Sequence, residues 1–288
     1  MDSSEFDLEL SSGRLHAKRH GSPDAPLVIA IPGLSANLMS FQFIGERLAE
    51  AGMQLVALDL RGRGRSDVTA VGTYGWVNHA TDVLAVADAL GAARCSLIGH
   101  SMGAAVAMAA AQQGAGRLDR IVLIDLCGVP DPSTRGPIAA STSRLGMVFP
   151  TLDDYLERVR STGVITPWST YWEQYFAYEL QPAEGGVTAR TSAAAVMEDA
   201  MFGAGAFAFG DDAGIYGLWH SLTMPVLALR ATREMVPGTG FILSARDAER
   251  FPGKVRSAVV REIDANHFTI ATTDETVTAI KQFFSAGY

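Results

Sequence analysis

The stretch Gly99-His100-Ser101-Met102-Gly103 decides the fold of this 288-residue chain. It follows a short apolar run at 95–98 and precedes small residues at 104–113 that we expect to be helical. A G-x-S-x-G pentapeptide between a strand and a helix is the context of a nucleophile elbow. The two glycines permit a sharp turn and a close approach of helix and strand. The sequence therefore predicts that this serine is exposed above a sheet as a candidate nucleophile.

Strands and helices alternate on both sides of the elbow. Segments with apolar residues at helical spacing separate the strands, and two of them end at Gly52 and Gly91. This alternation predicts an α/β protein with a mostly parallel sheet and right-handed crossovers. Apolar runs predict buried strands, and two shorter segments predict a hairpin. The expected strands lie at 27–31, 54–58, 95–98, 121–125, 225–229 and 257–263, and the expected hairpin at 6–10 and 14–19.

The alternation stops between residues 128 and 222. This stretch reads as several helices interrupted by Gly and Pro, and it is rich in aromatic residues between 168 and 178. We see no internal repeat and no low-complexity linker. The stretch is therefore predicted to be an insertion over the sheet, with residues 1–127 and 223–288 forming the core.

Composition and charge exclude several classes of protein. Hydrophobic residues make up 48% of the chain and charged residues 19%, which favours a sizeable packed core. The net charge is −8 and there is no basic block, so nucleic-acid binding is not expected. The acidic segment 1–5 does not resemble a secretory signal, and no run reaches the ~18 apolar residues of a membrane span. With Cys95 and Cys127 interpreted as reduced thiols, we expect a cytoplasmic protein that does not bind membranes.

A serine hydroxyl needs a base to remove its proton, and the base needs a third group to orient it. His267 is the candidate base, because it lies between the last expected strand and the last expected helix, where a loop can reach the elbow. Two N–H donors must also face the oxygen on which negative charge develops. We expect these to be the backbone N–H groups of Met102, directly after Ser101, and of Leu34.

Taken together, these motifs resemble the α/β-hydrolase superfamily, in its branch with an inserted cap. The resemblance extends over nearly the whole chain and implies an α/β-hydrolase fold with an eight-stranded sheet, helices on both faces, and a mainly helical cap at 128–222. Most relatives carry His at the position of Pro32, but a backbone donor at the next loop position does not depend on that side chain. The matching pieces are the elbow, Pro32-Gly33-Leu34, Asp59-Leu60-Arg61-Gly62 with Gly64 and Ser66, the strand ending at Asp125, Pro225-Val226-Leu227, and Asn266-His267-Phe268.

The acid that orients His267 has two candidates. The family usually supplies it from the loop after the strand at 226–229, which places Glu234 at that position, although Ala231 replaces the usual glycine and Glu replaces Asp. A minority of the family takes the acid from the end of the preceding core strand, where this chain has Asp125. The segment 178–187 resembles capped hydrolases that use this earlier position. Both residues remain candidates.

Other residues are candidates for binding substrate or for a structural role. The aromatic rings between 168 and 178 share two helical faces, one of which can line a pocket and favour an apolar or aromatic substrate. Arg61, Arg63 and Arg65 are expected to hold a structural turn through salt bridges. No His or Cys cluster has metal-ligand spacing, so we expect no metal and no cofactor. The candidate substrate-binding residues are Gly33, His100, Trp168, Trp172 and Phe202, with Phe207 and Phe209 as further members of an apolar rim.

The sequence thus predicts a serine hydrolase that cleaves an ester, lactone or amide bond of a small, partly apolar substrate through an acyl-enzyme. Cleavage of a C–C bond next to a carbonyl is an alternative, since similar capped relatives use the same triad for it. A non-hydrolytic receptor or cyclase on this scaffold is a third possibility. The nucleophile Ser101 disfavours the dehalogenase and epoxide hydrolase branches, which the resemblance associates with Asp. We expect a monomer or a homodimer.

Overall fold

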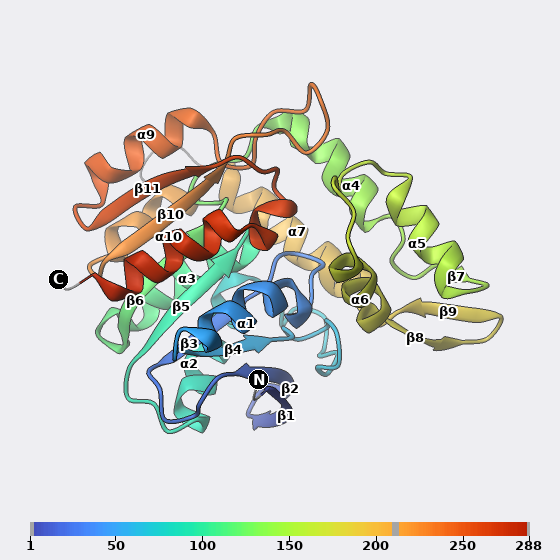
Figure 1. Cartoon of the computed structure of the whole chain (residues 1–288), viewed down its shortest axis with the longest axis horizontal. Helices are drawn as coiled ribbons and strands as arrows, with labels where there is room; N and C mark the ends of the chain where they lie inside the picture. The colour runs from blue at the N-terminus through green and yellow to red at the C-terminus, as the bar shows by residue number, and fades with distance from the viewer. Residues whose placement is uncertain (1–2, 209–212, 287–288) are drawn as a thin grey trace.

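The computed structural model describes residues 3–208 and 213–286, and Figure 1 shows the course of the chain. Eight strands form one sheet in the order β1-β2-β4-β3-β5-β6-β10-β11. β2 pairs antiparallel with β1 and with β4, and all later neighbours are parallel. The expected α/β fold with a mostly parallel eight-stranded sheet is confirmed. The strands are β1 (Ser3–Leu10), β2 (Gly13–His20), β3 (Leu27–Ile31), β4 (Gln54–Leu58), β5 (Cys95–His100), β6 (Leu118–Ile124), β10 (Val226–Ala231) and β11 (Ala258–Ile263).

Helices cover both faces of this sheet. On one face, α2, α3 and α9 contribute buried apolar residues to a large core cluster. On the other face, α1 and α10 pack in a second cluster. The two clusters are separated by the sheet because successive strand residues point to opposite faces. The helices are α1 (Gln42–Glu50), α2 (Trp76–Ala89), α3 (Met102–Gly114), α9 (Ala245–Lys254) and α10 (Asp274–Ser285).

The strand β3 shows why the apolar runs were recognisable in the sequence. All five of its residues are buried. Ile29 and Ile31 belong to one core cluster, whereas Val28 and Ala30 belong to the other. A strand that is buried on both faces must be apolar at every position, and this produces a continuous run rather than an alternating pattern.

The stretch between β6 and β10 contains helices, as expected, and also a small three-stranded antiparallel sheet in the order β7-β9-β8 that the sequence pattern did not reveal. These strands have two to four residues each, too few for a recognisable alternation. In Figure 1, α4 to α6 and β7 to β9 lie together at one end of the molecule. The elements are α4 (Arg135–Thr142), β7 (Val148–Phe149), α5 (Leu152–Arg160), α6 (Thr170–Glu179), β8 (Leu180–Ala183), β9 (Gly186–Ala189), α7 (Ala193–Phe207) and α8 (Gly214–Gly217).

The end of this stretch packs on the core. Ile215 and Trp219 are buried in the same apolar cluster as α3. The indole Nε1 of Trp219 donates a hydrogen bond to the carbonyl oxygen of Cys127 at 2.6 Å. The chain segment that leaves β6 and the one that enters β10 are therefore held side by side.

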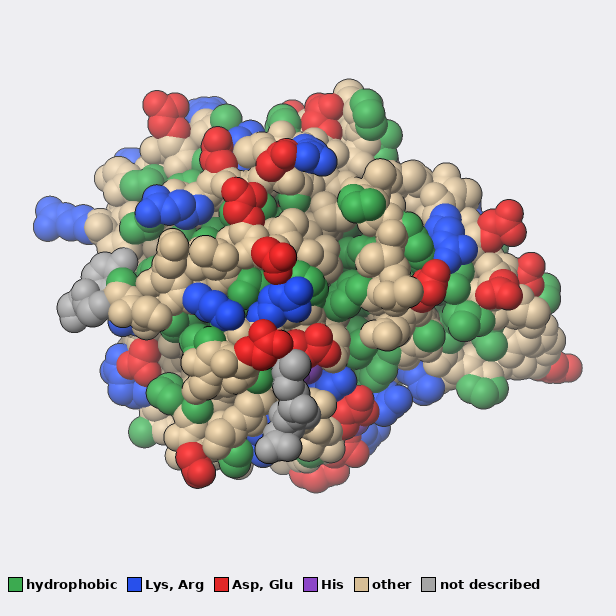
Figure 2. All heavy atoms as spheres, in the orientation of Figure 1, with side chains coloured by type: hydrophobic (Ala, Val, Ile, Leu, Met, Phe, Trp, Pro, Cys, Tyr) green, Lys and Arg blue, Asp and Glu red, His purple; other side chains and the backbone are tan. Residues whose placement is uncertain are grey.

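Acidic and basic side chains are interspersed on the face of the molecule in Figure 2, and neither kind gathers into one large patch there. In the part of the chain that the structure describes, no helix combines the length and the apolar character needed to cross a membrane.

Candidate active site

Ser101 lies in the turn between β5 and α3. Its backbone φ of 55° falls in the left-handed region, which a residue with a side chain adopts only when its surroundings impose it. Gly103 makes this turn possible, since an added Cβ would lie 2.0 Å from the carbonyl oxygen of Ile31. At Gly99 an added Cβ would lie 2.2 Å from the carbonyl oxygen of Gly103. The two glycines thus allow the strand and the helix to approach closely enough to form the elbow.

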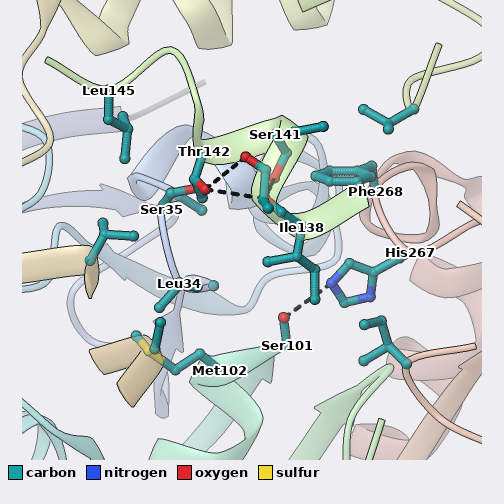
Figure 3. Close-up of a pocket in the computed structure, with 18 of the residues that line it drawn as sticks. Leu34, Ser35, Ser101, Met102, Ile138, Ser141, Thr142, Leu145, His267 and Phe268 are labelled. Carbon is teal, nitrogen blue, oxygen red and sulfur yellow. Dashed lines mark hydrogen bonds between the residues drawn. The ribbon is translucent and has the colours of Figure 1, made fainter. Parts of the chain in front are cut away.

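Three residues that are far apart in the sequence meet above the sheet. The Nε2 atom of His267 lies 3.0 Å from Oγ of Ser101, and its Nδ1 atom lies 2.8 Å from Oδ2 of Asp125 (Figure 3 shows the first of these contacts). Because an ionised carboxylate only accepts hydrogen bonds, the imidazole donates from Nδ1 to Asp125. Nε2 of the neutral ring is then free to accept the proton of Ser101.

Asp125 is held in place by the neighbouring strand β10. Its φ is also in the left-handed region, at 54°, and its other carboxylate oxygen accepts a hydrogen bond from Ala231 N at 2.9 Å. Burial raises the pKa of the Asp125 carboxyl above its usual value, and the hydrogen bonds from His267 and Ala231 oppose this rise. A carboxylate in this position can orient the ring and stabilise its charged form.

Glu234, the other candidate acid, is directed elsewhere. Its two carboxylate oxygens accept hydrogen bonds from the amides of Gly238 at 2.7 Å and Gly240 at 3.0 Å. The side chain therefore closes its own loop, and the structure brings Asp125 rather than Glu234 to His267. The sequence left this choice open because both residues follow strands that neighbour one another in the sheet.

The loop after β3 lies against the elbow. An added Cβ at Gly33 would lie 3.3 Å from the Cβ of Ser101, so only glycine allows this approach without displacement. Leu34 and Met102 both line the cavity beside Ser101, on the side opposite His267 in Figure 3. Met102 begins α3, and the first N–H groups of a helix have no partner within the helix. Both residues expected to supply the backbone donors therefore line the cavity beside Ser101.

His100 supports the loop that carries His267. Its Nε2 atom lies 2.8 Å from the carbonyl oxygen of His267, so the ring donates a hydrogen bond from Nε2. Burial and the neighbouring His267 lower the pKa of His100 to about 3, which keeps the ring neutral. His100 also lines the cavity, so the structure allows both the core-facing role and the ligand contact considered from the sequence.

A cavity of about 510 Å³ opens above Ser101. Its walls come from the loops of the core and from α4, α5, α6 and α7, and most of the lining side chains are apolar. Trp172 lines it as expected, together with Tyr175 and Phe176 of the same helix. Ile138 of α4 points toward Ser101 and His267 in Figure 3. Sequence reasoning missed Ile138, because no apolar pattern in this short helix marks the side that faces the cavity.

Two expected binding residues must be corrected. Among the described residues that line the cavity, Trp168 and Phe202 are not included. Trp168 instead stacks on Phe176, with ring centroids 5.9 Å apart and nearly parallel planes. Phe202 is partly exposed and covers the ring of Trp76, which itself lines the cavity, at a centroid distance of 5.5 Å. Phe207 does line the cavity, whereas Phe209 lies outside the described residues.

The basic turn after β4 has the structural role expected for it. Arg61 donates two hydrogen bonds to Asp82, at 2.7 and 2.6 Å, and Arg65 forms an ion pair with Glu5 at 2.6 Å. Arg63 is fully buried in a further ion pair with Asp199. Within residues 3–208 and 213–286, no group of three or more His, Cys, Asp or Glu residues is arranged to hold a metal ion.

Known proteins resemble this chain in sequence and fold. Residues 26–274 match the family model for the alpha/beta hydrolase fold. N-formylmaleamate deformylase of Pseudomonas putida is 39% identical over 124 residues, which are 43% of this chain and 43% of the deformylase. The match thus spans less than half the length of that relative.

Two further proteins are similar over more of their length. The 2-hydroxymuconate semialdehyde hydrolase of Pseudomonas putida is 29% identical over 233 residues, which cover 74% of this chain and 79% of the relative. The crystal structure of E-2-(acetamidomethylene)succinate hydrolase has a TM-score of 0.81 at 21% identity, over 99% of this chain and all of that one. We conclude that this chain belongs to the alpha/beta hydrolase family and has hydrolases among its relatives.

Proposed function

We propose that the protein is a serine hydrolase in which Ser101, His267 and Asp125 form the catalytic triad. The observation that carries this proposal is the pair of contacts at His267, 3.0 Å to the Ser101 hydroxyl and 2.8 Å to the Asp125 carboxylate, at the base of a cavity. Such an arrangement activates a serine because the ring accepts its proton while the carboxylate stabilises the charged ring.

The proposed reaction uses each of these groups in turn. His267 removes the proton from Ser101 as the serine oxygen attacks the substrate carbonyl. The N–H groups of Leu34 and Met102 donate to the oxyanion that forms, and each such donor is worth ~3 kcal/mol of barrier. His267 then protonates the leaving group. A water molecule, activated by the same ring, hydrolyses the acyl-enzyme and restores the serine.

The stretch 128–222 is proposed to be a cap that closes the site. Helices α4 to α7 supply most of the cavity wall that faces the core. Since the lining is largely apolar, with Trp172 and Tyr175 among its rings, we propose a small substrate with an apolar or aromatic portion. Its scissile bond is proposed to be an ester, lactone or amide. The deformylase among the relatives favours including amides.

A second candidate is hydrolysis of a C–C bond next to a carbonyl. The 2-hydroxymuconate semialdehyde hydrolase, which is similar over 74% of this chain, favours this alternative. The same serine, histidine and oxyanion donors would serve it, because it also involves attack on a carbonyl carbon. A panel of esters, lactones, amides and diketones separates the two candidates by turnover.

A fluorophosphonate probe tests the proposed nucleophile. The wild-type protein should be labelled at Ser101 and should hydrolyse a p-nitrophenyl ester, and Ser101→Ala should lose both the label and at least ~10³-fold in kcat. Ser96→Ala is a matched control, because this serine lies in β5 of the same elbow and is buried. Absence of labelling and of turnover of every acyl substrate in the wild type would contradict the proposal and favour a receptor.

A further inference from the structure

A buried ion pair joins the core to the insertion directly behind the loop that carries Leu34. Nη2 of Arg63 lies 2.6 Å from Oδ2 of Asp199, and both side chains are fully shielded from solvent. Arg63 belongs to the turn after β4, and Asp199 belongs to α7. The ion pair therefore links the turn after β4 to helix α7.

The same arginine holds Leu34. Nε and Nη2 of Arg63 donate to the carbonyl oxygen of Leu34 at 3.0 and 2.8 Å, and Nη1 donates to the carbonyl oxygen of Arg61 at 3.0 Å. The N–H and the carbonyl of Leu34 are attached to one Cα. The two hydrogen bonds to the carbonyl oxygen therefore restrict the backbone angles of Leu34, and these angles set the direction of its N–H. Because the guanidinium is planar, it donates both hydrogen bonds from a fixed direction.

Asp199 is in turn held from the core side. Its carboxylate accepts hydrogen bonds from the amide of Gly75 at 2.6 Å and from Nε2 of His79 at 2.9 Å. Burial acts to raise the pKa of Asp199, but the hydrogen bond from His79 and the charge of Arg63 outweigh it and lower the pKa. Asp199 therefore stays ionised, and it fixes the guanidinium only when α7 lies in this position.

We propose that Arg63 and Asp199 are positioning residues that make the oxyanion donor of Leu34 depend on the docking of α7. This inference rests on the proposed function, because it concerns the same reaction. The contact between Arg63 of the core and Asp199 of the proposed cap would then contribute to the reaction by positioning the N–H of Leu34. A displaced α7 would release Asp199, the guanidinium would lose its anchor, and the N–H of Leu34 would no longer be aimed at the oxyanion.

The turn itself supplies a matched control. Arg61 and Asp82 form a second buried ion pair two residues away, with side chains exposed by only 7% and 2%. Their pair stays within the core, and the remaining hydrogen bonds of Arg61 go to the carbonyl oxygens of Thr73 and Asn78. Loss of this pair should affect stability as much as loss of the other, without acting on Leu34.

The test compares Arg63→Lys with Arg61→Lys. A lysine keeps the charge but cannot donate two fixed hydrogen bonds to one carbonyl. We expect Arg63→Lys to lower kcat for a p-nitrophenyl ester about 10- to 100-fold with KM within about twofold, since small misplacements of catalytic groups have effects of this size. Binding of a trifluoromethyl ketone, which forms an oxyanion on Ser101, should weaken by a similar factor. Arg61→Lys should lower the Tm to a similar extent with little change in kcat.

Asp199 is tested by a conservative and a disruptive variant. Asp199→Asn keeps one oxygen acceptor and should retain more kcat than Asp199→Ala. Equal losses of kcat in Arg63→Lys and Arg61→Lys would overturn the inference. Effects of the Asp199 variants on KM alone would also overturn it, because they would mean that Asp199 contacts the substrate. If wild-type Ser101 is not labelled by the fluorophosphonate, the proposed function fails first, and this inference fails with it.

Discussion

Two residues of the candidate triad share an unusual backbone. Ser101 and Asp125 have φ values of 55° and 54°, and no other described non-glycine residue has a positive φ. Each such conformation costs about 1–3 kcal/mol. They persist because neighbouring strands hold them. The amide of Ser101 donates to Ile124 O at 2.9 Å, and the amide of Asp125 donates to Leu229 O at 2.7 Å. Backbone strain therefore accompanies the placement of both functional groups.

The choice of acid can be tested residue by residue. Asp125→Asn should lower kcat by about 10³- to 10⁴-fold, because the asparagine amide can donate its N–H to Nδ1 and so favours the wrong tautomer of the ring. Glu234→Gln should lower kcat by less than about tenfold, since this side chain bonds its own loop. Steady-state turnover of one ester distinguishes them, and equal losses in both variants would argue against Asp125 as the acid.

At the scale of elements, the close packing of α3 on the sheet positions the nucleophile. The residues from Met102 to Ala111 are all buried, and most of them are alanine. Small side chains bring the helix axis near the strands, and the helix N-terminus then lies directly behind the serine. Helix α3 could be predicted from the sequence because a run of small residues after G-x-S-x-G is typical of the helix that follows a nucleophile elbow.

Gly103 is the most sensitive point of this packing. Gly103→Ala would place a methyl group 2.0 Å from the carbonyl oxygen of Ile31, so β3 and α3 must separate. We expect a loss of about 1–3 kcal/mol in the free energy of unfolding, as for overpacked cores, together with reduced activity. Gly116→Ala is the control, because an added Cβ there meets nothing within 4 Å. Urea denaturation measures both, and equal stability of the two variants would contradict the close approach.

At the scale of the whole molecule, buried neutral histidines link stability to pH. His20 is almost fully buried at the end of β2, and its Nε2 has no hydrogen-bond partner among the described residues. Burial, with a contribution from Lys18, lowers the pKa of His20 to about 4 from 6.5. Above pH 6.5 the folded and unfolded chains are both neutral at this residue. Below it the unfolded chain takes up a proton that the folded chain does not, so stability falls until about pH 4.

This linkage predicts a measurable loss of stability in acid. His20 alone should lower the free energy of unfolding by about 2 kcal/mol between pH 7.5 and pH 5. His20→Leu, which cannot be protonated, should lose correspondingly less over the same range, whatever its stability at pH 7.5. Urea titrations of both proteins at pH 7.5, 6 and 5 give the difference. Parallel pH profiles for the two proteins would show that His20 is protonated in the folded state.

Local features of this protein could be predicted from its sequence. Continuous apolar runs identified the central strands, and the G-x-S-x-G pattern identified the turn at Ser101, because burial on both faces and a sharp turn each restrict neighbouring residues directly. His267 was recognisable as a candidate base from its place after the last strand. Each of these features depends only on the spacing of apolar residues, on the residues that a turn requires, or on the order of segments along the chain.

Which distant groups meet could be seen only once the chain was folded. It brought Asp125 rather than Glu234 to the imidazole, turned Trp168 and Phe202 away from the cavity, and paired Arg63 with Asp199. The physical reason is that such contacts depend on the direction that each loop and helix takes after its element ends. For Asp125 with His267 and for Arg63 with Asp199, that direction is set by packing between segments more than a hundred residues apart, which leaves no local pattern in the sequence.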